Sequence, residues 1–154
     1  MEIYTSIKDR LNSQHLTIKE LIQRLDKEFI NRSLETGKWS IRENLVHIVS
    51  YHQVFLQRMD KIIKSDNPYF DRYTFEGDAH FDKMEKLDSL ELLIHLEEER
   101  KKVTDFIFKL NKSELQKPGS HQKFGAMNVV EWIEFFLLHE AHHIYTIFKL
   151  SRMN

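Results

Sequence analysis

The chain contains no cysteine, and this absence removes three kinds of chemistry. Without thiols there is no disulfide framework, no thiolate metal site and no cysteine nucleophile. An excess of one charge is also missing, because 23 basic residues stand against 24 acidic ones and give a net charge of -1. This balance provides no general attraction to nucleic acid or to an anionic membrane surface, so we expect neither as a partner.

Long apolar runs are absent as well. No stretch approaches the roughly 18 consecutive apolar residues that would span a membrane. The first six residues, Met-Glu-Ile-Tyr-Thr-Ser, lack the apolar segment of a secretory signal, so we expect a cytoplasmic protein. A length of 154 residues with 41% hydrophobic content suits one globular domain over residues 1–154.

Helix-breaking residues are few, with four glycines and two prolines in the whole chain. The stretches between them carry apolar residues at three- and four-residue spacing and predict helices over 2–31, from 40 to about 66, over 88–111, and from 128 onward. Ser40 with Glu43, and Asn128 with Glu131, form capping-box patterns at two of these starts. No alternating pattern predicts a strand, so we expect an all-α four-helix bundle.

The connection over residues 66–87 is long for a bundle loop. Such a crossover can carry the chain back along the bundle, which would leave the second and third helices parallel. It also contains aromatic residues, so we expect it to pack against the helices: Tyr69, Phe70, Tyr73, Phe75 and Phe81.

The last predicted helix contains an unusual pair of histidines. His139 and His143 are four residues apart, so they project from one face of the helix. The same face carries Trp132, Phe136 and Ile147, which places the pair toward the bundle interior. Neutral imidazole is the commonest protein ligand for metals, and a shared ion would compensate the burial of two imidazoles. The alternative is a hydrogen-bonded core pair without metal.

These residues also match the His-Glu-x-x-His pattern of zinc proteases. We reject that interpretation because the positions of the usual extension hold Thr146 and Lys149, and no acidic residue follows Glu140. A third ligand must come from another helix, and the candidates are His47 and His52, of which helical periodicity slightly favours His52. The remaining histidines are expected at the surface or in loops: His15, His80, His95 and His121.

The stretch from Trp39 to His47, followed much later by His139 and His143, resembles the DinB-like family of metalloenzymes, also called YfiT-like. The resemblance implies an up-down-down-up four-helix bundle and a metal site made by His47, His139 and His143. Many relatives continue with Arg-Gly-Gln where this chain has Ile-Tyr-Thr at 144–146, so any substrate contact of that tripeptide is not carried over.

Three histidines would leave a divalent ion one open position, as in catalytic sites, which predicts a metal-dependent enzyme. Zinc and nickel fit imidazole ligands best, with iron and manganese also allowed. The resemblance implies thiol-dependent transfer or isomerisation, or hydrolysis, of a small molecule together with a low-molecular-weight thiol. Glu140 and His142 are candidates for moving protons, although Glu140 could instead support a ligand imidazole. The rival hypothesis is a non-enzymatic, stress-associated metal-binding or interaction protein.

The last helix also predicts assembly. Between Phe135 and Phe148 its single acidic or basic residue is Glu140, so the helix is apolar on most sides. Such a helix is either central or covered by something else. We therefore expect a homodimer that buries part of this surface, with coverage by residues 66–87 as the alternative.

Overall fold

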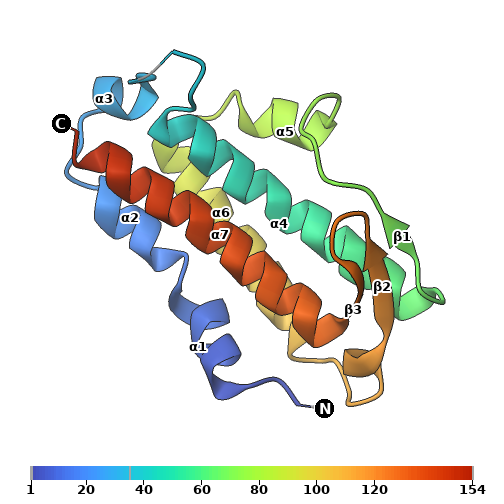
Figure 1. Cartoon of the computed structure of the whole chain (residues 1–154). Helices are drawn as coiled ribbons and strands as arrows, with labels where there is room; N and C mark the ends of the chain where they lie inside the picture. The colour runs from blue at the N-terminus through green and yellow to red at the C-terminus, as the bar shows by residue number, and fades with distance from the viewer. Residues whose placement is uncertain (1, 35, 154) are drawn as a thin grey trace.

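The protein folds into a helical bundle with a small sheet at one end, as shown by a computed structural model that describes residues 2–34 and 36–153 (Figure 1). Its elements, in chain order, are α1 (Thr5–Ser13), α2 (Leu16–Ile22), α3 (Lys27–Asn31), α4 (Ile41–Lys64), β1 (Tyr69–Phe70), α5 (Ala79–Met84), α6 (Ser89–Ile107), the 3₁₀ turn η1 (Glu114–Gln116), β2 (Pro118–His121), β3 (Gly125–Asn128) and α7 (Val129–Ser151).

The two helices joined by the crossover, α4 and α6, run parallel. At one end Arg42 donates a 2.7 Å hydrogen bond to the carbonyl of Leu87, just before α6 begins. At the other end Lys117, which follows α6, donates to the carbonyl of Ile63 near the end of α4. In Figure 1 both helices accordingly run from the upper left to the lower right.

The first and last helical runs take the opposite direction. Arg10 of α1 donates to Glu134 of α7 at 2.6 Å, and Gln14 donates to the carbonyl of Leu137 at 2.9 Å. The residue numbers increase in the same direction along both helices, so α1 and α7 are parallel to each other. Both are antiparallel to α4 (Figure 1). The bundle therefore runs up, down, down and up.

The first run is broken, and our prediction of one continuous helix over 2–31 was wrong. At the first break the Gln14 amide donates to the Leu137 carbonyl of α7 and, at 2.8 Å, to Glu140. At the second break Asp26 caps a new helix by accepting from the Phe29 amide at 2.7 Å. The apolar spacing continues across both breaks, so periodicity could not reveal them.

The predicted starts of the long helices are confirmed. Ser40 and Glu43 form a complete capping box at α4, and Asn128 and Glu131 form one at α7. Asp88 begins α6 in the same way, although α6 ends at Ile107 rather than near residue 111. A favourable N-cap typically stabilises a helix by about 1 kcal/mol. These caps fix where α4 and α7 begin, and therefore which residues face each other.

The prediction of no strand was also wrong. A three-stranded sheet has the order β1-β2-β3, with β1 parallel to β2 and β2 antiparallel to β3. Its strands of two to four residues are too short to show alternation, and β1 pairs across the sequence with residues 120 and 121. The hairpin lies close against the bundle, because a Cβ at Gly119 would come within 2.6 Å of the Ile62 side chain.

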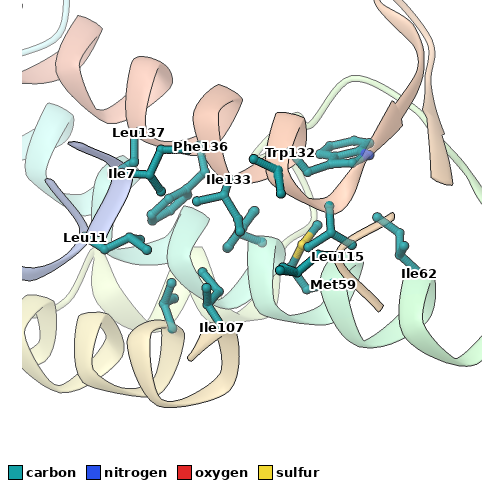
Figure 2. Close-up of a cluster of buried hydrophobic side chains, with 14 of the residues drawn as sticks. Ile7, Leu11, Met59, Ile62, Ile107, Leu115, Trp132, Ile133, Phe136 and Leu137 are labelled. Carbon is teal, nitrogen blue, oxygen red and sulfur yellow. The ribbon is translucent and has the colours of Figure 1, made fainter. Parts of the chain in front are cut away.

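The core lies between α7, α4, α6 and α1 (Figure 2). Trp132 and Phe136 of α7 are at most 1% exposed, as are Phe55 and Met59 of α4. Burying one large apolar side chain contributes roughly 1.5–3 kcal/mol, so this packing holds α4 and α7 in a fixed relation. Among the described residues, no helix is both long enough and apolar enough to cross a membrane.

Candidate metal centre

Three histidines from two helices converge between α4 and α7. His47 of α4 and His139 and His143 of α7 each offer a ring nitrogen, and these atoms all lie within 4.8 Å of one another. The Nε2 atoms of His47 and His139 are 3.1 Å apart. Zinc–nitrogen bonds of about 2.0–2.1 Å in a tetrahedral site separate neighbouring nitrogens by about 3.3 Å. The three side chains named by the family resemblance therefore lie together, at a spacing that could hold one divalent ion.

His52, the other candidate for the third position, lies elsewhere. It is completely buried, with Nδ1 2.7 Å from the Ile48 carbonyl and Nε2 3.6 Å from Glu140. The middle of the apolar stripe therefore faces the helical core. The edge of the stripe, where His47 lies, faces the other two histidines. Periodicity alone could not make this distinction.

Asn44 orients His143. Its Nδ2 donates to the Ser40 carbonyl at 2.8 Å, so its Oδ1 is the atom that faces His143 Nδ1, at 2.9 Å. An amide oxygen only accepts hydrogen bonds, so this contact requires the proton of the neutral imidazole to sit on Nδ1. The Nε2 lone pair of His143 is then free for a ligand, which is a common way to prepare a metal-binding imidazole.

The three imidazoles stay neutral over the physiological pH range. Burial lowers the pKa of His47 to about 4. Burial, followed by the neighbouring histidines, lowers the pKa of His143 to about 3 and that of His139 to about 2. Neutral imidazole is the form that binds metal, so protons do not compete for the site near pH 7.

The two proposed proton carriers lie in different surroundings. Glu140 is 1% exposed and accepts from Arg100 of α6 and from Gln14, on a different face of α7 from the triad. His142 is exposed, and its ring centroid lies 5.2 Å from that of His143. Proximity to the triad therefore favours His142.

A cavity of about 700 Å³ opens onto the triad. Its walls include the crossover and the β2–β3 hairpin. Beyond the triad, the lining residues are Trp39, Tyr51, Arg58, Arg72, Tyr73, Thr74, Phe75, Glu76, His121, Lys123, Phe124, Phe135 and His142. A second cavity of about 530 Å³ shares Trp39, His142 and His143 with the first.

Sequence reasoning missed several of these wall residues. Tyr51 and Arg58 follow His47 by four and eleven residues, a helical spacing that could have identified them. The Tyr51 ring centroid lies 4.3 Å from that of His139. His121, expected at the surface or in a loop, is 5% exposed in the cavity wall, and its placement depends on the hairpin that sequence analysis did not predict. His15 is likewise 6% exposed.

Comparison with protein families decides the classification. The sequence model of the DinB superfamily matches residues 13–147, which is most of the chain. The chain belongs to the DinB superfamily. This result confirms the family indicated by the Trp39–His47 segment and the paired histidines of α7.

Two bacterial relatives of the chain have names that refer to a metal. A protein of Bacillus cereus (strain 03BB102) is 24% identical over 135 residues, which cover 88% of this chain and 78% of the relative. A protein of Bacillus mycoides (strain KBAB4) is 25% identical over 149 residues, covering 96% and 83%. Both are provisionally named metal-dependent hydrolases.

Solved structures share the fold. YfiT from Bacillus subtilis, described as a probable metal-dependent hydrolase with an unusual four-helix bundle topology, superimposes with a TM-score of 0.80 at 16% identity, covering 96% of this chain and 85% of YfiT. TT2238, described as a four-helix bundle protein, gives a TM-score of 0.67 at 17% identity, covering 92% and 94%. At such low identity these matches establish the four-helix bundle fold.

Proposed function

We propose that this DinB protein is a metal-dependent enzyme whose divalent ion is held by His47, His139 and His143. The observation that carries the proposal is the convergence of three neutral imidazoles, those of His47 and His143 buried and that of His139 half-buried, on one point that opens into a cavity. In residues 2–34 and 36–153, no fourth histidine or carboxylate joins this group. A set of three protein ligands leaves a position for water or substrate, as catalytic zinc sites do.

The bound metal would lower the pKa of a water or thiol at the site, or polarise a leaving group. Zinc or nickel suits the all-imidazole ligand set best. Hydrolysis agrees with the names of the relatives, and transfer or isomerisation involving a low-molecular-weight thiol is the second candidate. The chain itself has no cysteine, so any thiol must come from a substrate.

The surrounding side chains have definable tasks. Asn44 holds His143 in the tautomer that presents Nε2. Trp39 and Tyr73 pack at 5.1 and 5.7 Å from the His47 ring, between centroids, and limit the access of water. Burial raises the pKa of Tyr51, so its hydroxyl keeps its proton and can donate a hydrogen bond to substrate. We assign proton exchange with solvent to His142.

A rival function uses the same ion without catalysis. In that case the metal ties α4 to α7 in a binding or stress-associated interaction protein, and its loss lowers stability alone. The two large cavities that meet at His143 favour the enzyme, because a purely structural ion has no need of an adjacent open space. We further propose that the protein is a cytoplasmic homodimer.

The test begins with elemental analysis of protein purified without a histidine tag. We expect one equivalent of zinc or nickel per chain, and a large loss in His143→Ala. Metal-free, zinc-loaded and nickel-loaded protein are then screened against ester, amide and phosphoester substrates, with and without a small thiol. Metal-dependent turnover that His143→Ala abolishes supports the enzyme. Metal that raises the melting temperature, with no turnover in any combination, supports the structural role.

A further inference from the structure

The cavity beside the triad carries an unbalanced positive charge. Its lining includes Arg58, Arg72 and Lys123 but one carboxylate, that of Glu76. The segments that bring these cations together are held to each other, because the Arg72 amide donates to the Gln122 side chain at 3.1 Å. Three separate elements, α4, the crossover and the β2–β3 hairpin, thus direct positive residues to one space.

Arg58 is the buried member of this group, at 8% exposure. Its guanidinium donates to the Asp71 carbonyl at 2.7 Å and to the Tyr51 hydroxyl at 3.4 Å, both of which are uncharged groups. Within the described part of the chain, no carboxylate forms an ion pair with it. A buried charge without a counter-charge is costly, and an anionic ligand would supply the missing opposite charge.

Aromatic rings support the Arg58 side chain. Its guanidinium carbon lies 5.5 Å from the Phe70 ring centroid, 5.7 Å from that of Trp132 and 6.0 Å from that of Tyr51. These contacts hold the guanidinium plane in place before any ligand arrives. Preorganised arginine suits carboxylate and phosphate groups, which accept two parallel hydrogen bonds from its planar fork.

We propose that this cationic end of the cavity, with Arg58 at its centre and Arg72 and Lys123 at its rim, binds the anionic group of a small-molecule substrate. The anionic group is a carboxylate or a phosphate. The inference rests on the proposed function, because the remainder of the same molecule then reaches the triad. Tyr51 spans the two ends, since its ring lies 4.3 Å from His139 between centroids and its hydroxyl meets Arg58.

The two tryptophans of the chain allow each end to be tested separately. Trp132 lies beside Arg58, whereas Trp39 lies beside the triad, at 5.1 Å from His47 and 6.0 Å from His143 between ring centroids. In ¹H–¹⁵N spectra of the metal-free full-length protein, each indole N–H gives its own signal. Sodium phosphate and sodium acetate are titrated as separate probes, and zinc chloride is titrated in a third experiment.

We expect a saturable shift of the Trp132 signal with at least one of the two anions. Saturation by phosphate alone identifies a phosphate-bearing substrate, and saturation by acetate alone identifies a carboxylate. Arg58→Gln should weaken anion binding at least ten-fold. Arg72→Gln combined with Lys123→Gln, both at exposed positions, should weaken anion binding several-fold. The matched control is Arg24→Gln, because Arg24 is exposed and lies outside the cavity lining, and this variant should leave the affinity for the anion unchanged.

The outcomes separate this inference from the proposed function. No saturable Trp132 shift with either anion, or equal affinity in wild type and in both cavity variants, overturns the anion site. A zinc titration that leaves Trp39 unmoved overturns the metal site, whatever the anions do. If Arg58→Gln fails to fold, the Arg72→Gln, Lys123→Gln double variant decides the question.

Discussion

Asn44 and His143 form a buried hydrogen bond of 2.9 Å between the amide oxygen and Nδ1 across the α4–α7 interface. The bond joins the first turn of α4, which Ser40 caps, to the middle of α7. It therefore links the start of one helix to the orientation of a metal-binding imidazole in another. Loss of such a supporting bond typically lowers metal affinity 10–100-fold.

We accordingly expect Asn44→Ala to weaken zinc binding roughly 10–100-fold. Asn44→Asp retains an oxygen that accepts from His143 Nδ1 and should bind zinc within a few-fold of wild type. Zinc affinity is measured by competition with a chromophoric chelator, and circular dichroism verifies the fold of each variant. Zinc binding by Asn44→Ala at wild-type strength would show that the hydrogen bond does not prepare the site.

The order of the helices could be derived from the sequence because it depends on local signals. Capping residues and apolar spacing mark where α4, α6 and α7 begin. The long crossover allowed α4 and α6 to be parallel, and the family resemblance implied the same order. The breaks in the first run and the small sheet escaped prediction, because both depend on partners distant in sequence. Gln14 bonds α7, and β1 pairs with β2 some fifty residues later.

The metal site, too, could be predicted from the sequence only in part. The i,i+4 spacing of His139 and His143 predicted a pair on one face, but the choice of His47 over His52 came from family resemblance. Helix geometry places both on α4, and only tertiary packing decides which of them faces α7's histidines. His121 became visible as a wall residue once the hairpin was placed, whereas the helical spacing of Arg58 from His47 could have identified that residue.

The stability of the metal-free protein should depend on pH. The folded-state pKa values of His47, His139 and His143, about 4, 2 and 3, lie below the usual value of 6.5. At pH values between the folded-state and unfolded-state pKa, the unfolded chain binds more protons than the folded protein, so the free energy of unfolding rises with pH. The stabilisation is complete above about pH 6.5 and is lost as the pH falls through the folded-state pKa values, from about 4 for His47 to about 2 for His139.

Urea midpoints at pH 7.5, 6.5, 5.5 and 4.5 measure this dependence. Wild type should lose stability progressively below pH 6.5. His139→Ala removes one of the shifted groups and should show a shallower decline, even if its stability at pH 7.5 is lower. A wild-type midpoint that stays constant from pH 7.5 to 4.5 would contradict the lowered pKa values of these three imidazoles.

The ion pair of Glu140 with Arg100 should contribute to stability rather than to metal binding. Both residues are at most 2% exposed, and removing one partner from a buried pair costs about 3–5 kcal/mol. We expect Glu140→Gln to lower the free energy of unfolding by that amount and to leave zinc affinity within a few-fold of wild type. Urea denaturation and chelator competition measure the two effects independently.

A double substitution serves as the control for the ion pair. Replacing both partners by apolar residues, in Glu140→Leu with Arg100→Met, leaves no unpaired charge and should recover much of the loss. A Glu140→Gln protein of wild-type stability that loses turnover while binding metal normally would instead assign Glu140 to the chemistry.

The outward face of α7 should mediate the homodimer. Leu138, Tyr145 and Phe148 are 57%, 60% and 45% exposed, so the crossover does not cover them as the alternative required. Leu138 and Tyr145 are seven residues apart, about two turns, and lie on one side of the helix. Two antiparallel copies of α7 would bury this stripe and extend it with Leu16, which is 42% exposed on neighbouring α2.

Light scattering at micromolar concentration should give the mass of two chains, twice 18.6 kDa. Leu138→Glu combined with Tyr145→Glu places two like charges from each copy in the interface and should yield monomers. Leu90→Glu is the matched control, because Leu90 is 67% exposed on α6, away from this face, and the dimer should persist. Dissociation by Leu90→Glu would move the interface to α6, and a monomeric wild type would remove the dimer from the proposal while leaving the metal site, which one chain completes, intact.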